Sequence, residues 1–372
     1  ELQAIEMNKS YRLVADLDVS DLEWDPIGTF SDPFLGIFDG NGHTITGLTI
    51  TDENNNMNGL FGYIEGDVMD LTLIDISYDY LTDSLTYAGG IAGFTQGDVK
   101  NCSVTGDITI ENTAGNTFSG LLVGYSESDL SQTLEEFAPS EISGNQVSGT
   151  IDIIASQIAY VGGLIGKTYD TSVLENISDA TITVDAQATN VPVYVGGLIG
   201  HNYGGALYPF ADQVDNIYIY VQDNISTSTI NLTDESANLY AGGFMGFNQK
   251  GYLRDNYSST SIELTGTKTD ANTVRIGGFL GENFESTVER IFVSAHIGAS
   301  GFDATYETSL YVVGDFSEID AEDIFLYVDD MTGTFTFEGD DVTLITVSQK
   351  GDLDFYIDSL GWTTEFINDF LG

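Results

Sequence analysis

Tyr160-Val-Gly-Gly-Leu-Ile-Gly166 is the stretch that decides the fold, because versions of it recur along the chain. Seven copies of this glycine box are present, at residues 59–62, 89–93, 120–124, 162–166, 196–200, 242–246 and 277–281, with a degenerate eighth at 312–316. Successive closing glycines lie 31, 31, 42, 34, 46 and 35 residues apart. These intervals predict a structural repeat of about 30 residues that carries loop insertions.

Strand patterns surround each box. An aromatic and a small apolar residue precede most copies, as in Tyr160-Val161, whereas the seventh copy has Arg275-Ile276. A polar turn and a second motif follow, as in Val99–Val104, Leu174–Ile177 and Val214–Ile219. Segments with alternating apolar residues come next, such as Ile182-Thr-Val184, and they indicate strands with one buried face.

A single repeat of three short strands cannot bury its apolar face, but stacked repeats form a continuous core. We therefore predict an all-β fold, a β-solenoid resembling a parallel β-helix, with about eight coils of about 30 residues. The repeated glycines fit positions with positive φ or close backbone approach. A β-propeller is the alternative, although 31 residues are few for a four-stranded blade.

The two ends differ from the middle, as expected for the capping repeats of a solenoid. Residues 1–50 are predicted to form an N-terminal cap and the first coil, and residues 51–314 the regular coils. Residues 315–372 lose the glycine box and are predicted to form degenerate last coils and a C-terminal cap within one continuous domain. Both tryptophans, Trp24 and Trp362, lie in these end segments.

Several motifs resemble the GLUG-repeat family of bacterial secreted and cell-surface proteins. They are the glycine boxes, Trp24-Asp-Pro-Ile-Gly28, the segment Phe38-Asp-Gly-Asn-Gly-His43 and the closing Leu360-Gly-Trp362. The resemblance covers nearly the whole chain, most clearly residues 1–300. It implies a stalk or binding surface of large exported adhesins, cell-wall-attached proteins or secreted peptidases. This chain departs from the family pattern by its acidity and by the loss of the box after residue 314.

The charge balance is extreme, with 58 acidic against 10 basic residues and a formal net charge of −48. Such a surface repels phosphate backbones and anionic lipids, so we expect no nucleic-acid partner. No segment is long and apolar enough to insert into a membrane. No signal peptide is visible, so we expect a mature or trimmed form of a secreted or cell-surface protein.

The acidic residues form either a solvated surface or sites for divalent cations, with calcium as the expected cofactor because it prefers oxygen ligands. The candidate metal ligands lie in acidic turns, where Asp and Asn are also favoured for conformational reasons alone. They are Asp39, Asn41, Asp329, Asp330, Asp340 and Asp341.

Catalytic motifs are scarce. His43, His201 and His296 are scattered, no His-Glu-x-x-His pair exists, and we expect no enzyme activity. A carbohydrate-active enzyme remains an alternative, since carboxylate pairs support glycoside cleavage. Cys102 cannot form an intramolecular disulfide, and we predict a buried apolar role at a position that other coils fill with Ile, Leu or Val.

Two insertions, at residues 126–140 and 201–213, are the candidate binding loops. The second contains an aromatic cluster that would either stack on sugar rings or pack over the side of the solenoid: His201, Tyr203, Tyr208 and Phe210. Six glycosylation sequons are present, at Asn8, Asn101, Asn176, Asn224, Asn231 and Asn256. Asn101 and Asn176 are assigned to the same position of the repeat, which also suits ladder or turn residues.

Three functions remain open at this stage. The first is a structural or adhesive module that binds a protein or glycan on a surface. The second is a subunit that assembles with copies of itself into an extracellular filament or surface layer. The third is the carbohydrate-active enzyme. The sequence pattern favours the first, because repeats, acidity and family resemblance agree with it.

Overall fold

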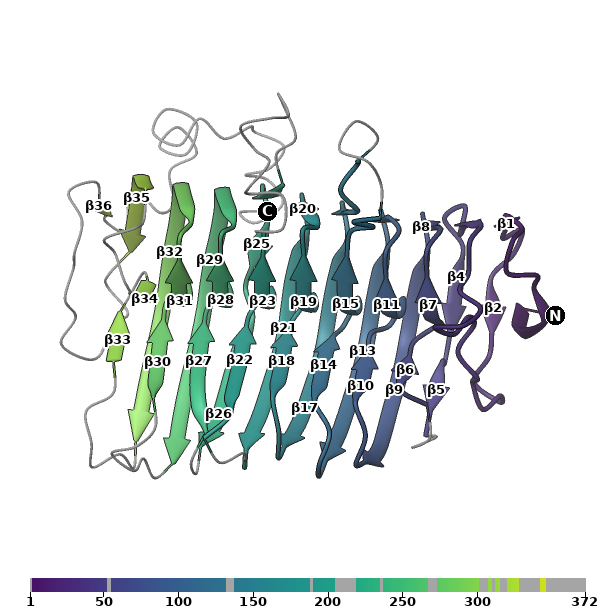
Figure 1. The fold of residues 1–372 in the computed structure, drawn as a ribbon, viewed down its shortest axis with the longest axis horizontal. Helices are drawn as coiled ribbons and strands as arrows, with labels where there is room; N and C mark the ends of the chain where they lie inside the picture. The colour runs from purple at the N-terminus through teal and green to yellow at the C-terminus, as the bar shows by residue number, and fades with distance from the viewer. Residues whose placement is uncertain are drawn as a thin grey trace.

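The computed structural model describes residues 2–51, 55–131, 137–187, 190–204, 219–234, 237–266, 273–300, 307–309, 312–314, 320–327 and 342–345. Within these residues the chain winds into a stack of coils that begins at the N-terminus and extends along one long axis (Figure 1). One short 3-10 helix, η1 (Leu2–Ala4), precedes the strands. The named strands pair in parallel between successive coils, for example β13 with β17 and β17 with β21. The fold is therefore the parallel β-solenoid that the repeats predict.

Three sheets form the walls of the solenoid. Among the described residues sheet 1 has 20 strands, and sheets 2 and 3 have eight each. Sheet 2 consists of β6 (Met57–Asn58), β10 (Thr86–Ala88), β14 (Thr117–Gly120), β18 (Ala159–Gly162), β22 (Pro192–Gly196), β27 (Asn238–Gly242), β30 (Val274–Gly277) and β33 (Glu307–Ser309). Sheet 3 consists of β7 (Phe61–Ile64), β11 (Ala92–Thr95), β15 (Val123–Glu127), β19 (Ile165–Tyr169), β23 (Ile199–Tyr203), β28 (Met245–Gln249), β31 (Leu280–Phe284) and β34 (Val312–Gly314).

Sheet 1 contains a short strand and a longer strand from most middle coils. The short strands are β1 (Tyr11–Arg12), β3 (Ile37–Asp39), β8 (Asp67–Met69), β12 (Val99–Lys100), β16 (Glu141–Ser143), β20 (Ser172–Leu174) and β24 (Tyr220–Gln222). The others are β2 (Leu17–Asp18), β4 (Thr44–Thr46), β5 (Thr49–Ile50), β9 (Thr72–Thr82), β13 (Ser103–Asn112), β17 (Gln146–Ala155), β21 (Ile177–Ala186), β25 (Ile225–Ser226), β26 (Thr229–Asp234), β29 (Tyr252–Gly266), β32 (Thr287–Ser300), β35 (Asp320–Tyr327) and β36 (Val342–Ile345). A middle coil such as β16–β19 thus has four strand segments, one more than the sequence predicts.

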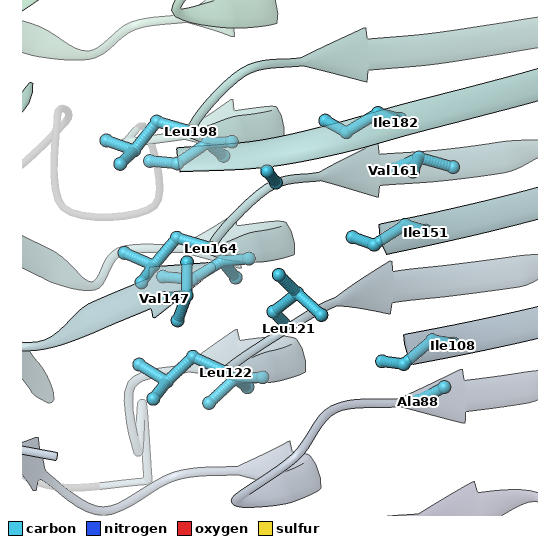
Figure 2. Packing of buried hydrophobic residues seen from close by; sticks show 14 of the residues in the cluster. Ala88, Ile108, Leu121, Leu122, Val147, Ile151, Val161, Leu164, Ile182 and Leu198 are labelled. Atoms are coloured by element: carbon cyan, nitrogen blue, oxygen red, sulfur yellow. The ribbon is translucent and has the colours of Figure 1, made fainter. Parts of the chain in front are cut away.

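The core consists of apolar columns that run along the solenoid axis. Ile108, Ile151 and Ile182 on sheet 1 occupy equivalent positions in successive coils and are fully buried. Leu122, Leu164 and Leu198 form a second column beside them, as Figure 2 shows. Because each coil covers the apolar face of the next, the period-2 pattern of the sequence becomes one continuous core.

The glycine boxes mark the bend between sheets 2 and 3, where the backbones approach closely. A Cβ atom on Gly166 would lie 2.6 Å from the carbonyl oxygen of Gly124 and 2.8 Å from that of Tyr160. No side chain fits such a gap, so close approach explains these glycines. Positive φ angles occur outside the boxes, for example at Gly106 and Gly149.

The N-terminal segment covers the first regular coil. Trp24 is buried, and its indole Nε1 donates a hydrogen bond to the carbonyl oxygen of Leu60 at 3.1 Å. The degenerate eighth box contributes β34, which pairs with β31. Trp362 lies outside the described residues, together with most of 315–372, and the predicted domain boundaries stay predictions.

Candidate functional site

Two rows of side chains face each other across the bend between sheets 2 and 3. We call them the aromatic array. On sheet 2 the strand registers align Tyr87, Phe118, Tyr160, Tyr194 and Tyr240. On sheet 3 they align Tyr63, Phe94, Tyr125, Lys167, His201 and Phe247. The aromatic residue that precedes most boxes is therefore one half of a pair, and its partner follows the box.

The rings of the sheet 2 row stack face to face along the solenoid axis. The ring centroids of Phe118 and Tyr160 are 4.6 Å apart, and those of Tyr160 and Tyr194 are 5.2 Å apart, with interplanar angles of 17° and 14°. Stacked aromatic pairs contribute about 0.5–1.5 kcal/mol each beyond their buried area. Because neighbouring rings cover each other's faces, this row favours cohesion between coils over stacking on sugar rings.

His201 and Tyr203 lie in β23 and not in a loop, which corrects the sequence prediction. The His201 ring is 8% exposed and lies 5.1 Å from the Tyr194 ring and 5.0 Å from the Phe247 ring. Tyr203 stacks on Tyr169 at 4.7 Å. Of the two roles considered for these aromatics, packing over the side of the solenoid is the one observed. Tyr208 and Phe210 lie outside the described residues.

Burial perturbs the titratable groups of the array. Desolvation, with the nearby Lys167 charge, lowers the pKa of His201 to about 3. Desolvation also lowers the pKa of Lys167, whose Nζ lies 4.9 Å from the Tyr160 ring centroid. Neither His201 nitrogen has a hydrogen-bond partner among the described residues. His201 is therefore neutral at physiological pH, which suits its place among aromatic rings.

A buried asparagine ladder runs along sheet 1, with Asn145, Asn176 and Asn224 directly before β17, β21 and β25 and with Asn256 inside β29. The Nδ2 of Asn145, Asn176 and Asn224 each donates to the Oδ1 of the next ladder residue, ending at Asn256, at 2.9, 3.0 and 3.1 Å. Asn176 Nδ2 also donates to the carbonyl oxygen of Ile142 at 2.9 Å. The ladder satisfies polar groups in the interior and ties four coils together.

The ladder includes several of the asparagines that the sequence offers as glycosylation sites. Three of the six sequon asparagines, Asn176, Asn224 and Asn256, are fully buried ladder members. Asn101 is exposed and pairs with the Gly144 position, so it does not share the repeat position of Asn176. Asn8 is exposed, and Asn231 lies half-buried on β26.

Cys102 occupies the ladder position in its own coil. Its backbone N–H donates to Asn145 Oδ1 at 2.8 Å, and burial raises the pKa of its thiol to about 12. Its predicted buried role is confirmed. The prediction that other coils place an aliphatic residue here is right for Leu71 and Ile291 and wrong for the asparagines.

The strand register also places the second motif of one coil later in the chain than the sequence predicts. Val221 and Ile225 pair with Val173 and Ile177, so residues 221–225 take the place assigned from the sequence to 214–219. Residues 214–218 lie outside the described part of the chain.

A second ladder lines the inner face of sheet 3. Thr168 Oγ1 donates to Asn202 Oδ1 at 2.7 Å, Asn202 Nδ2 donates to Asn248 Oδ1 at 2.8 Å, and Asn248 Nδ2 donates to Asn283 Oδ1 at 2.9 Å. These side chains are buried. The second ladder therefore connects four successive coils through the interior of the solenoid.

The candidate calcium ligands Asp39 and Asn41 form a turn that already has a cation. Arg12 Nε lies 3.1 Å from Asp39 Oδ2, and the Arg12 guanidinium also donates to Asn41 Oδ1. The Asn41 backbone N–H donates to Asp39 Oδ1 at 2.7 Å. Asp329, Asp330, Asp340 and Asp341 lie outside the described residues. In the part of the chain that the structure describes, no three His, Cys, Asp or Glu side chains are grouped to hold a metal ion.

The other histidines form pairs far apart in the chain. His43 Nδ1 lies 3.1 Å from Asp16 Oδ1, and His296 Nε2 lies 3.1 Å from Glu263 Oε1. Among the described residues, no helix is long and apolar enough to span a membrane.

The chain is similar to a solved structure and to a family model. One solved structure, from Bacteroides ovatus and described as "a putative immunoglobulin A1 protease", is 14% identical, with a TM-score of 0.46. The match covers 94% of this chain and 81% of that one. No curated protein sequence matches the chain significantly. A family model described as "The GLUG motif" matches residues 84–109, which include the box at Gly89–Gly93. The chain therefore contains a GLUG motif, as the resemblance of its glycine boxes predicts.

Proposed function

We propose that the chain is a non-enzymatic structural and adhesive module of a secreted or cell-surface protein, which holds a binding surface for a protein or glycan. The observation that carries this proposal is the continuous coil-to-coil network of the aromatic array and the two polar ladders. Such a network suits a stiff element that transmits force along its axis, because each coil is held to its neighbours on more than one side. The GLUG motif at residues 84–109 supports the same conclusion.

Binding and cleavage assays on the intact chain test this function. We expect saturable binding to a surface glycan or protein, without release of products from polysaccharides or peptides. Release of oligosaccharides at a rate that depends on chain concentration would instead support the carbohydrate-active enzyme. Failure to bind across broad glycan and protein panels would argue against the adhesive role.

A second function, the filament subunit, is favoured by the N-terminal end of the stack. A cavity of about 560 Å³ is open there, and its lining includes Trp24 and Phe38 together with Val14 and Leu22, which are 87% and 50% exposed. In the described pairings β1 and β2 each have one neighbour, β3 and β4. An apolar end whose described strands pair on one side only is suited to receive the last coil of another copy.

Electron microscopy of the intact chain separates the two functions. End-to-end assembly predicts filaments that disperse when Val14→Asp is combined with Leu22→Asp. The matched control replaces Leu85 and Leu130, which are 39% and 41% exposed elsewhere, by aspartate. Dispersed single rods for the unmodified chain would rule out the filament and leave the structural and adhesive module as the proposed function.

A further inference from the structure

The outer face of sheet 1 has an apolar groove that runs across four coils. Its volume is about 300 Å³, and it crosses β9, β13, β17 and β21. Leu81, which is 49% exposed, and the half-buried Ile154 contribute apolar surface, and Thr109 and Thr183 add methyl groups. Because the flanking side chains are carried by a paired sheet, the groove is held by the scaffold and not by a loop.

Each of the four coils contributes one carboxylate to the groove, and the carboxylates alternate between its two sides. One row of the register runs Asp79, Thr109, Asp152 and Thr183, and the neighbouring row runs Leu81, Glu111, Ile154 and Asp185. Asp79, Glu111 and Asp152 are exposed, and Asp185 is half-buried and accepts a hydrogen bond from Gln187. None of these four carboxylates takes part in a described ion pair with Lys, Arg or His.

The spacing does not suit a single metal ion. Diagonal neighbours on adjacent strands, such as Asp79 and Glu111, are about 7–8 Å apart. Carboxylates on the same side, such as Asp79 and Asp152, are two strands or about 9–10 Å apart. Calcium holds its oxygen ligands at about 2.3–2.6 Å. The complementary ligand is therefore extended and carries several separate positive charges.

We propose that this groove binds a linear polyamine. Its ammonium groups would meet the alternating carboxylates, which extend over about 14 Å of axis at one step of about 4.8 Å per coil. The methylene segments between the ammonium groups would cover Leu81 and Ile154. A basic peptide fits less well, because its backbone N–H and C=O groups would lie on the apolar floor without partners. This inference goes beyond the proposed function and is independent of it.

Titration calorimetry of the full chain with spermine tests the proposal, at about 0.15 M salt, where the Debye length is about 8 Å. We expect saturable binding with one spermine per chain. The variant Glu111→Gln with Asp152→Asn should weaken binding at least tenfold. The matched control, Asp107→Asn with Asp179→Asn, removes the same charge from the same face outside the groove and should stay within twofold.

Equal weakening in both double variants would overturn the proposal, because it would reduce the binding to general attraction by the net charge of −48. Binding of many spermine molecules without saturation would overturn it as well. A tetralysine peptide should bind more weakly than spermine, and tighter binding of the peptide would exclude the polyamine as the preferred ligand. Ile154→Thr keeps the β-branched shape, removes apolar surface and should weaken spermine binding about threefold. Unchanged binding by this variant would contradict the role of the apolar floor.

Discussion

The middle coils and the coil that follows them place different side chains at the same positions beside the bend between sheets 2 and 3. In the middle, Tyr240 and Phe247 face each other across the bend with ring centroids 6.1 Å apart. One coil later the same positions hold Arg275 and Glu282, which form an ion pair. The two residues of each pair flank a glycine box at the same bend of the coil. The backbone stacking therefore sets the fold, whereas the side chains at each position set how strongly neighbouring coils adhere.

The asparagine ladder shows the same contrast. Its four members lie between Cys102 in one flanking coil and Ile291 in the other. An apolar residue at this position needs only burial, but an asparagine needs its neighbours in both directions. The middle of the stack should therefore be more sensitive to single polar substitutions than its flanks.

The largest expected effect comes from breaking the ladder at Asn176. Asn176→Ala removes its bonds to Asn145 and Asn224 and leaves buried polar groups unpaired, at about 1–3 kcal/mol for each group. We expect a loss of about 3 kcal/mol in the free energy of unfolding, measured by urea denaturation. Asn231→Ala, on the outer side of β26, is the control and should stay within about 0.5 kcal/mol. Equal losses for both variants would contradict the ladder.

The ion pair of the flanking coil gives the next largest effect. Arg275→Tyr should destabilise the chain by about 2 kcal/mol, because Glu282 is 8% exposed and loses a cation. Combining it with Glu282→Phe should recover the loss and add up to about 1 kcal/mol, since the new rings extend the aromatic array. A double variant less stable than the single one would show that the array cannot be extended at this coil.

The sequence predicts the features that follow from residue type alone. It does not predict the features that depend on which residues the strand register aligns. The boxes identify the coil because close approach at residues such as Gly166 excludes every side chain. The ladder is harder to predict from the sequence, because the exposed Asn101 and the buried Cys102 are adjacent. Only the strand pairing shows which of the two aligns with Asn145. The sequence predicts a loop at His201 because residues 201–213 interrupt the repeat, whereas the register pairs His201 with Lys167 and Phe247. Insertions of variable length hide such alignments.

A pH experiment sharpens the contrast within the array itself. The unfolded His201 gains a proton below about pH 6.5, whereas burial lowers the pKa in the folded chain to about 3. This group therefore contributes stability that is complete above pH 6.5 and is lost as the pH falls towards 3. Between pH 7 and pH 5, His201→Phe should gain about 2 kcal/mol relative to the unmodified chain.

Urea denaturation at pH 7, 6 and 5 measures this difference. His43→Asn is the control, since His43 lies beside Asp16 outside the array. A constant difference between His201→Phe and the unmodified chain at all three values would mean that His201 is protonated equally in both states. The histidine would then not be buried among the rings.

The smallest expected effect concerns calcium at the N-terminal turn. Arg12 already contacts Asp39 and Asn41, so a calcium ion would have to displace a bound cation. We expect calcium to raise the melting temperature no more in the unmodified chain than in Asp39→Asn, and no more than magnesium at equal ionic strength. A calcium-specific rise that Asp39→Asn abolishes would establish a site at this turn. A calcium-specific rise that survives the substitution would instead direct attention to Asp329, Asp330, Asp340 and Asp341, because the carboxylates of the sheet 1 groove are too far apart to share one ion.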